Sequence, residues 1–185
     1  TVSLLITPSL IGSVDWYLSC YSTQKENAYN SLKAMLNREY SKPSPAAQRG
    51  IDFEAAVYKE VAEQTGRGSE LFRWFVEQCK GGEFQAKATT YLTIGDKEYC
   101  LYGKIDARWP TIIKDIKTTG SYKGEASYLS TYQHLIYCYA EQIPVFEYII
   151  AEFSGSSILL ADKHVVRYEA PSWPEVCLLY TSDAA

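Results

Sequence analysis

The chain has 185 residues, of which 46% are hydrophobic and 22% are charged, a composition that argues against disorder and allows one substantial core. Its formal net charge of −4 argues against a protein that coats nucleic acid through a general positive excess. No apolar stretch approaches the roughly 20 residues of a membrane-spanning helix, and the apolar segment 2–6 is too short for a signal-peptide core. We therefore expect a cytoplasmic protein without a membrane partner.

The first half of the chain predicts helices, because apolar residues recur there at helical spacing. Thr7-Pro8-Ser9 marks the first helix start, and Ser44 followed by Pro45 supplies a cap and a first-turn proline for the third. The expected helices cover residues 7–20, 23–39, 45–64 and 70–80.

The second half of the chain predicts a sheet, beginning after Gly81-Gly82. Strands are expected at 84–94, 98–107, 111–118 and 145–153, with a helix at 125–141 and a terminal hairpin of 158–160 and 164–168 turned at Asp162-Lys163. This order predicts an α/β protein with three layers, in which helices cover both faces of one sheet.

Three charged residues near the middle of the chain predict a site. Asp115 and Lys117 stand two apart in an expected strand, so their side chains share a face. Asp106 ends the preceding strand, across a short turn. Two carboxylates and one lysine suit a divalent cation and a water molecule, as phosphodiester hydrolysis requires. An acidic-x-Lys triplet is weak on its own, and the alternative interpretation is a strand end with solvated charges.

Other chemistries have less support in the sequence. Neither histidine stands in a nucleophile motif, and no glycine-rich phosphate loop is present. The five cysteines are scattered without the paired spacing of a zinc or iron–sulfur site. We therefore interpret them as buried small hydrophobic residues.

Four short motifs, in order, resemble those of the PD-(D/E)XK nuclease superfamily, in particular its RecB-like and phage-exonuclease-like branches. The first is Gly-x-x-x-Glu at 50–54, on an expected helix, and the second is Gly-x-x-Asp at 103–106. The third is Asp-x-Lys at 115–117, and the last is Gln-x-x-x-Tyr at 133–137. Each motif is weak alone, whereas four in the right order on the right elements support one another.

The resemblance implies a restriction-endonuclease-like α/β fold, with an αβββαβ core, a mixed sheet and added N-terminal helices. It also implies dependence on Mg²⁺ or Mn²⁺ and cleavage of DNA. By this resemblance the metal would be bound by Glu54, Asp106, Asp115 and the backbone carbonyl of Ile116. The same three carboxylates would form the catalytic set with Lys117. Gln133 and Tyr137 would orient the DNA strand or the active-site groups.

The resemblance leads us to expect an exonuclease of recombination or repair, encoded by a phage and acting in a bacterial or phage-infected cell. Two alternatives stay open: an endonuclease of the same fold, and a catalytically inactive scaffold that binds DNA or protein. Phage-type relatives form rings, so a homo-oligomer or a recombination partner protein is compatible with this expectation.

One nuclease-like domain is expected to occupy residues 1–175. The last ten residues, 176–185, resemble translated sequencing-adapter read-through, and we interpret them as a non-native tail. Iron–sulfur members of the superfamily have one early and three late cysteines. Cys20 has no such late partners here, although a truncated C-terminus could hide them.

Overall fold

The computed structural model describes residues 4–39, 42–155 and 159–171. The expected tail at 176–185 lies outside these ranges. Among the helices described, none has the length and apolar character needed to cross a bilayer. The four cysteines of the described residues are all free.

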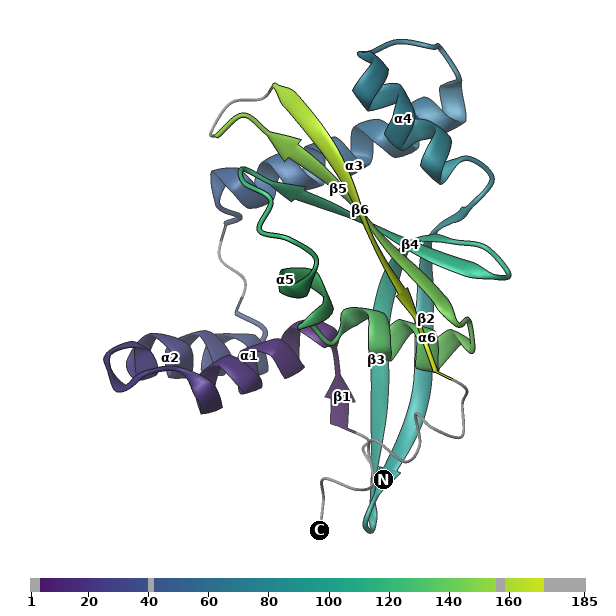
Figure 1. Cartoon of the computed structure of the whole chain (residues 1–185). Coiled ribbons are helices and arrows are strands. Elements are labelled where there is room, and N and C mark those ends of the chain that lie inside the picture. The colour runs from purple at the N-terminus through teal and green to yellow at the C-terminus, as the bar shows by residue number, and fades with distance from the viewer. Residues whose placement is uncertain (1–3, 40–41, 156–158, 172–185) are drawn as a thin grey trace.

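The N-terminal helices form where the sequence predicts them, and their starts have the expected caps. The Oγ1 of Thr7 accepts a hydrogen bond from the N–H of Leu10, and the Oγ of Ser44 accepts one from Ala47, each at 3.2 Å. The helices are α1 (Pro8–Ser19), α2 (Lys25–Leu36), α3 (Pro45–Glu63) and α4 (Glu70–Cys79), with a 3₁₀ turn η1 (Ser22–Gln24) before α2. The α1–α2 pair projects from the body of the molecule (Figure 1).

One six-stranded mixed sheet forms the centre of the molecule. Its strands are β1 (Leu4–Ile6), β2 (Glu83–Ile94), β3 (Lys97–Arg108), β4 (Ile112–Thr119), β5 (Val145–Phe153) and β6 (Leu160–Glu169). The order is β1-β3-β4-β5-β6, and β2 also pairs with β3. β1 and β3 are parallel, as are β4 and β5, whereas the other pairs are antiparallel. β1 was not among the predicted strands, because three residues are too few to show an alternating pattern.

The sheet divides into two ribbons at β3. β2 follows β3 along its whole length, so β1 and β4 share the opposite edge, at residues 99–101 and 107–108 of β3. Within the described chain, no strand pairs with that edge between residues 102 and 106. Figure 1 shows the β2–β3 ribbon running at a steep angle to β4, β5 and β6. We call this divergence the fork.

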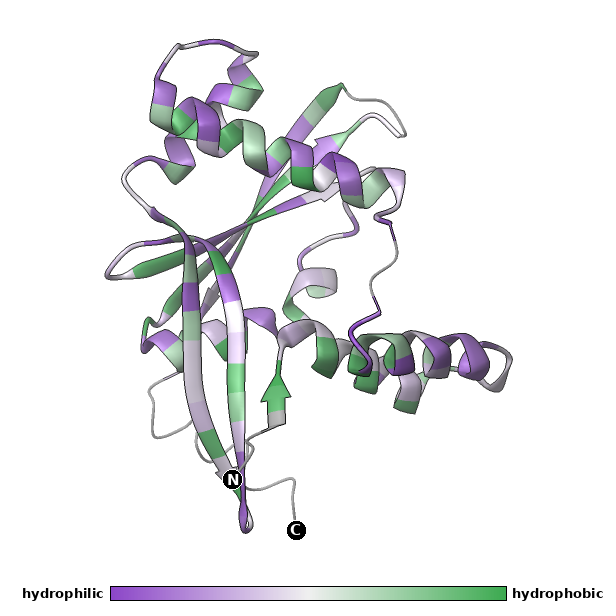
Figure 2. Ribbon diagram, turned by 180° about the vertical axis from the view of Figure 1, so that it is seen from behind, coloured by the Kyte–Doolittle hydropathy of each residue, from purple (hydrophilic) through white to green (hydrophobic). Residues whose placement is uncertain are grey.

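The two faces of the sheet carry separate hydrophobic clusters, as three layers require. Tyr148 and Ile150 of β5 belong to the cluster that includes Ile136 of α6 (Gln133–Glu141). The alternate positions Ile149 and Phe153 belong to the cluster built with α3 and α4. Hydrophobic and hydrophilic residues alternate along α3 and along the β2–β3 ribbon (Figure 2). The expected three-layer, restriction-endonuclease-like α/β fold is confirmed.

The helix expected at 125–141 is wrong, because the structure breaks it into α5 (Ala126–Leu129) and α6 (Gln133–Glu141). The hydroxyl of Thr131 donates a 2.8 Å hydrogen bond to the carbonyl of Tyr128, and side-chain bonds of this kind compete with helix formation. The break makes Gln133 the first residue of α6.

The turn expected at Asp162-Lys163 is also wrong. These residues pair with Glu152 and Ala151 inside β6, a continuous strand antiparallel to β5. Pairing with an apolar central strand outweighs the weak turn preference of an Asp-Lys dipeptide. His164, expected to begin the second strand of the hairpin, lies inside this longer strand.

His134 is a buried histidine on α6, only 2% exposed. Its Nδ1 lies 3.1 Å from the hydroxyl of Tyr148, which is also 2.9 Å from the Oγ1 of Thr131. Burial disfavours the charged imidazolium and lowers the pKa of His134 from 6.5 to about 4.

This low pKa predicts that the stability contributed by a neutral, buried His134 is lost in acid. The unfolded chain takes up the proton near pH 6.5 and the folded chain only near pH 4, so this contribution falls as the pH drops through the window. The expected loss is about 3 kcal/mol, at about 1.4 kcal/mol per pKa unit. Because other groups titrate in the same window, urea unfolding of the wild type and of His134→Asn at pH 7.5 and pH 4 would measure the contribution as the difference between the two proteins. His134→Asn keeps an amide within reach of Tyr148 and lacks the titrating imidazole, so an identical pH dependence in the two proteins would contradict the assignment.

Candidate active site

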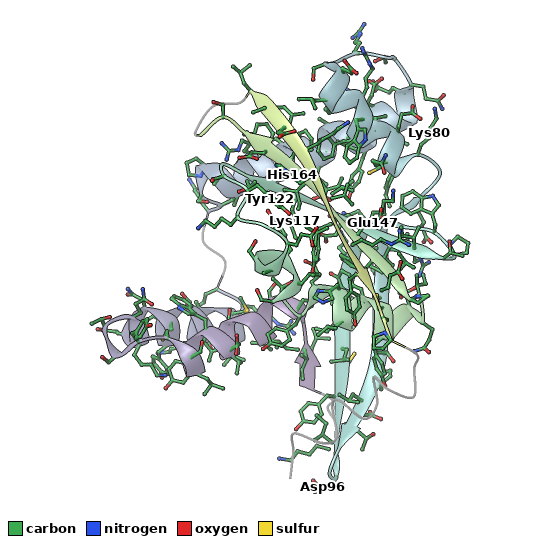
Figure 3. All side chains as sticks on the ribbon, viewed as in Figure 1. Lys80, Asp96, Lys117, Tyr122, Glu147 and His164 are labelled. Atoms are coloured by element: carbon green, nitrogen blue, oxygen red, sulfur yellow. The ribbon has the colours of Figure 1, made fainter. Side chains whose placement is uncertain are left out.

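The predicted site residues meet at the fork. Asp106 lies near the end of β3, and one of its carboxylate oxygens accepts a 2.8 Å hydrogen bond from the N–H of Ile116 on β4. This contact spans the divergence between the two ribbons and brings the backbone of Ile116 beside the carboxylate. Lys117 lies in the middle of the molecule, at the place where the ribbons separate (Figure 3).

Asp115, Lys117 and Gln133 form a closed triangle of one ion pair and two hydrogen bonds. The Nζ of Lys117 lies 2.6 Å from the Oδ2 of Asp115 and donates to the Oε1 of Gln133 at 2.8 Å. The Nε2 of Gln133 donates to the Oδ1 of Asp115 at 2.5 Å. Asp115 is 1% exposed, so its charge is held by partners rather than by water. The triangle fixes the position of the lysine ammonium.

Glu54 reaches the site from α3. Its Oε1 accepts a 2.7 Å hydrogen bond from the Nε2 of Gln85 on β2, and the same Nε2 lies 3.1 Å from the hydroxyl of Tyr58. Gly50 explains how the helix comes so close, because a Cβ atom there would stand 3.0 Å from the Oγ1 of Thr118 at the end of β4. Gly50, the glycine of the first motif, therefore allows α3 to pack closely against the sheet.

Negative charge exceeds positive charge at the site. Burial, followed by the nearby carboxylates of Asp115 and Glu54, raises the pKa of Asp106 from 3.8 to about 8. Burial alone would lower the pKa of Lys117, but its contacts with Asp115 outweigh burial and raise the pKa, so the ammonium stays charged at neutral pH. The three carboxylates offer hard oxygen ligands, which suit Mg²⁺ or Mn²⁺, and a single lysine offsets their charge.

Tyr137 is buried beside the open edge of β3. It is 4% exposed, and its hydroxyl donates a 2.8 Å hydrogen bond to the backbone carbonyl of Lys104, which lies in the unpaired stretch of that edge. Gly103 leaves room for the ring, since a Cβ atom there would stand 2.2 Å from a ring carbon of Tyr137. The tyrosine thus satisfies a backbone group that a neighbouring strand would otherwise satisfy.

Gly103→Ala is expected to destabilise the protein by about 1–3 kcal/mol, because the added methyl group forces the Tyr137 ring out of its packed position. Chemical denaturation would measure the change. Gly12→Ala is a matched control, since a Cβ atom at Gly12 meets nothing within 4 Å. Equal stability of the Gly103 variant and the wild type would contradict the packing described.

A groove of about 800 Å³ opens onto the triangle. The start of α1 forms one wall, from Thr7 to Gly12, and residues 130–133 before and at the start of α6 form another. Lys104, Lys117 and Gln133 also line it, so a ligand in the groove would meet the lysine of the site. Lys114, the residue before Asp115, is paired with Glu147 at 3.3 Å.

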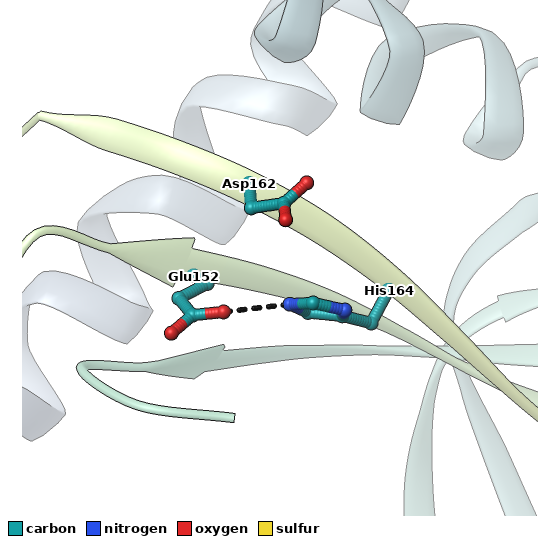
Figure 4. A group of neighbouring side chains, drawn as sticks. All are labelled: Glu152, Asp162 and His164. Atoms are coloured by element: carbon teal, nitrogen blue, oxygen red, sulfur yellow. Dashed lines mark hydrogen bonds and ion pairs between the residues drawn. The ribbon is translucent and has the colours of Figure 1, made fainter. Parts of the chain in front are cut away.

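A second cluster of ionisable residues lies on β5 and β6, outside the predicted site (Figure 4). The Nε2 of His164 lies 2.6 Å from the Oε2 of Glu152, and Asp162 is directly opposite Glu152 in the strand register. The other oxygen of Glu152 accepts a hydrogen bond from the N–H of Tyr122. Both oxygens of Glu152 therefore have protein partners, as in a surface ion pair. Because residues 162 and 163 were expected to form a turn, the alternation that places Asp162 and His164 on one face of β6 was not predicted.

Two contacts of the site were not predicted, namely those of Gln85 and Tyr58 with Glu54. Gln85 lies in an expected strand, and a lone glutamine there gives no signal of its own. Tyr58 stands four residues after Glu54, a spacing that puts both on one face of α3 and could have suggested the contact.

Comparison with known proteins gives a match in fold. No protein-family model matches the chain, and no curated protein matches its sequence. The crystal structure of SSO0001 has a TM-score of 0.55 and 14% identity, over 97% of this chain and 74% of that chain. The crystal structure of an alkaline exonuclease from Laribacter hongkongensis has a TM-score of 0.52 and 13% identity, over 94% of this chain and 82% of that chain. The chain thus shares the architecture of a known exonuclease.

Proposed function

We propose that this protein is a metal-dependent nuclease that hydrolyses phosphodiester bonds of DNA, as an exonuclease of recombination or repair. The observation that carries the proposal is the meeting of Glu54, Asp106, Asp115 and Lys117 at the fork, from three separate elements. The fold shared with an alkaline exonuclease supports the same reaction class. Carboxylates that can hold a divalent cation beside a fixed lysine suit metal-assisted hydrolysis of a phosphodiester.

The three carboxylates and the carbonyl of Ile116 would hold Mg²⁺ or Mn²⁺. When bound, the ion would neutralise charge on the scissile phosphate and make a coordinated water more acidic. A bound cation would favour the ionised form of Asp106, which burial and then the nearby carboxylates disfavour.

Lys117 would stabilise charge and orient the attacking water, and it would not remove a proton. Its raised pKa keeps the ammonium protonated at neutral pH, and a protonated amine is not a base. Gln133 would keep that ammonium in place through the hydrogen bond from the Lys117 Nζ to its Oε1. A fixed cation aimed at developing negative charge is an effective form of electrostatic catalysis.

The groove beside the triangle is the proposed path of the DNA strand. Its lining includes Lys104, whose positive charge would favour a phosphate. A local basic contact of this kind is compatible with a net charge of −4, because the metal ions would supply further positive charge.

The test is a nuclease assay on end-labelled linear duplex DNA and on closed circular DNA, with Mg²⁺ or with EDTA. We expect mononucleotides or short products from the linear substrate only in the presence of metal, and intact circles. Cleaved circles would indicate an endonuclease of the same fold. No cleavage of either substrate would overturn the proposed activity and favour a scaffold.

A further inference from the structure

Gln85 has a backbone conformation that is unusual for its place. It lies inside strand β2 with φ of +56°, in the left-handed region that few residues other than glycine adopt. Its neighbours Phe84 and Ala86 keep their ladder partners, Ala107 and Ile105. Gln85 itself is absent from the ladder, although the register places it opposite Asp106.

This conformation coincides with the contact to the proposed metal site. The side-chain amide of Gln85 donates to the carboxylate of Glu54 at 2.7 Å and lies 3.1 Å from the Tyr58 hydroxyl. Both partners lie on α3, which packs beside the sheet and not within it. Gln85 is therefore unpaired in the β2–β3 ladder opposite Asp106, one proposed metal ligand, and donates a hydrogen bond to Glu54, another.

Local strain of this kind tends to be retained at functional sites, where the surrounding structure holds a residue in a disfavoured conformation. The carboxylate of Glu54 is close enough to Asp106 to disfavour ionisation of Asp106. The neutral amide of Gln85 holds the Glu54 carboxylate in one position before a metal ion binds. Groups that hold metal ligands in this way commonly change metal affinity by about 10–100-fold when they are removed.

We propose that Gln85 is a positioning residue of the metal site, and that its left-handed backbone serves to hold the Glu54 carboxylate toward Asp106 for binding of a divalent cation. The inference rests on the proposed function, because it assumes that these carboxylates bind the ion. It assigns Gln85 no contact with the DNA and no part in proton transfer.

The Gln85→Gly variant separates an effect on stability from an effect on metal binding. Glycine adopts a φ of +56° without strain, so this variant should unfold in EDTA at a temperature equal to or above that of the wild type. Loss of the amide should nevertheless weaken Mn²⁺ binding at least about tenfold. Titration of the full chain with Mn²⁺ alone, followed by electron paramagnetic resonance of the free ion, would measure the affinity.

Two further variants complete the test. Gln142→Gly is a matched control, because Gln142 also has a φ of +56° but caps α6 and bonds to the carbonyl of Tyr139. It should bind Mn²⁺ like the wild type. Gln85→Ala removes the amide without relieving the backbone, so it should lose Mn²⁺ affinity by a similar factor. Excess Mn²⁺ should then restore its DNA cleavage.

The possible outcomes distinguish the positioning role of Gln85 from the proposed nuclease function on which it rests. Wild-type affinity for Mn²⁺ in both Gln85 variants would overturn the positioning role and leave the proposed nuclease intact. A marked fall in the unfolding temperature of Gln85→Gly would overturn the account of the backbone. If the wild type itself bound no Mn²⁺ near neutral pH, the metal site and this inference would both be wrong.

Discussion

Lys117→Ala is expected to lower DNA cleavage at least about a hundredfold, the usual effect of removing one fixed group that stabilises transition-state charge. The ammonium it removes is held by both Asp115 and Gln133 and lines the groove. Initial rates on linear duplex DNA under saturating Mg²⁺ would measure the loss.

The same substitution leaves the Asp115 carboxylate buried without its cation, which is strongly destabilising. Lys117→Arg is therefore the companion variant. It keeps the positive charge beside Asp115 and should remain folded, but a planar guanidinium cannot occupy the point position of an ammonium, so activity should still fall. Lys97→Ala is the control, because residue 97 begins β3 at the hairpin tip marked by Asp96, far from Lys117 (Figure 3). Undiminished cleavage by Lys117→Ala would contradict the proposed role.

Asp106→Asn is expected to stabilise the metal-free protein and to abolish cleavage. The neutral amide removes one of three mutually repelling carboxylates, and its oxygen can still accept the N–H of Ile116. The pKa of Asp106 is raised from 3.8 to about 8 in the folded chain, so the unfolded chain releases this proton at lower pH. The contribution of Asp106 to the stability of the metal-free protein should therefore be lost as the pH rises from about 4 to about 8.

Thermal unfolding in EDTA at pH 5 and pH 8.5 would measure this effect, and the Asn variant should lose less stability than the wild type. Adding Mg²⁺ should raise the unfolding temperature of the wild type by binding the folded state, with little effect on the variant. An equal pH dependence in the two proteins would contradict the repulsion described.

The sequence predicts the regular elements well where the physical signal is local. Ser44 and Pro45 begin α3 as expected, because a cap and a first-turn proline act within one helical turn. The break at Thr131 was missed, since its hydroxyl bonds both to Tyr128 and across to Tyr148 of a distant strand. A contact between residues so far apart in the chain produces no periodic pattern in the sequence.

The candidate site could be predicted only in part, for the same reason. Asp115 and Lys117 share one strand, so their spacing alone places them together. Glu54 depends on how close α3 comes to the sheet, which Gly50 permits and no residue pattern measures. The contact of Gln85 with Glu54 depends on a left-handed backbone within a strand, which strand periodicity cannot indicate.

The fork has a consequence for ion binding. Among the described residues, β3 and β4 pair in the ladder at two positions only, Ala107 with Lys114 and Arg108 with Ile113, and a hydrogen bond between Trp109 and Ile112 closes the turn between them. The hydrogen bond from Ile116 to Asp106 is a further link across this narrow junction. Asp106 stands on one side of it and Asp115 on the other, so an ion held by both carboxylates would fasten the two halves of the sheet together.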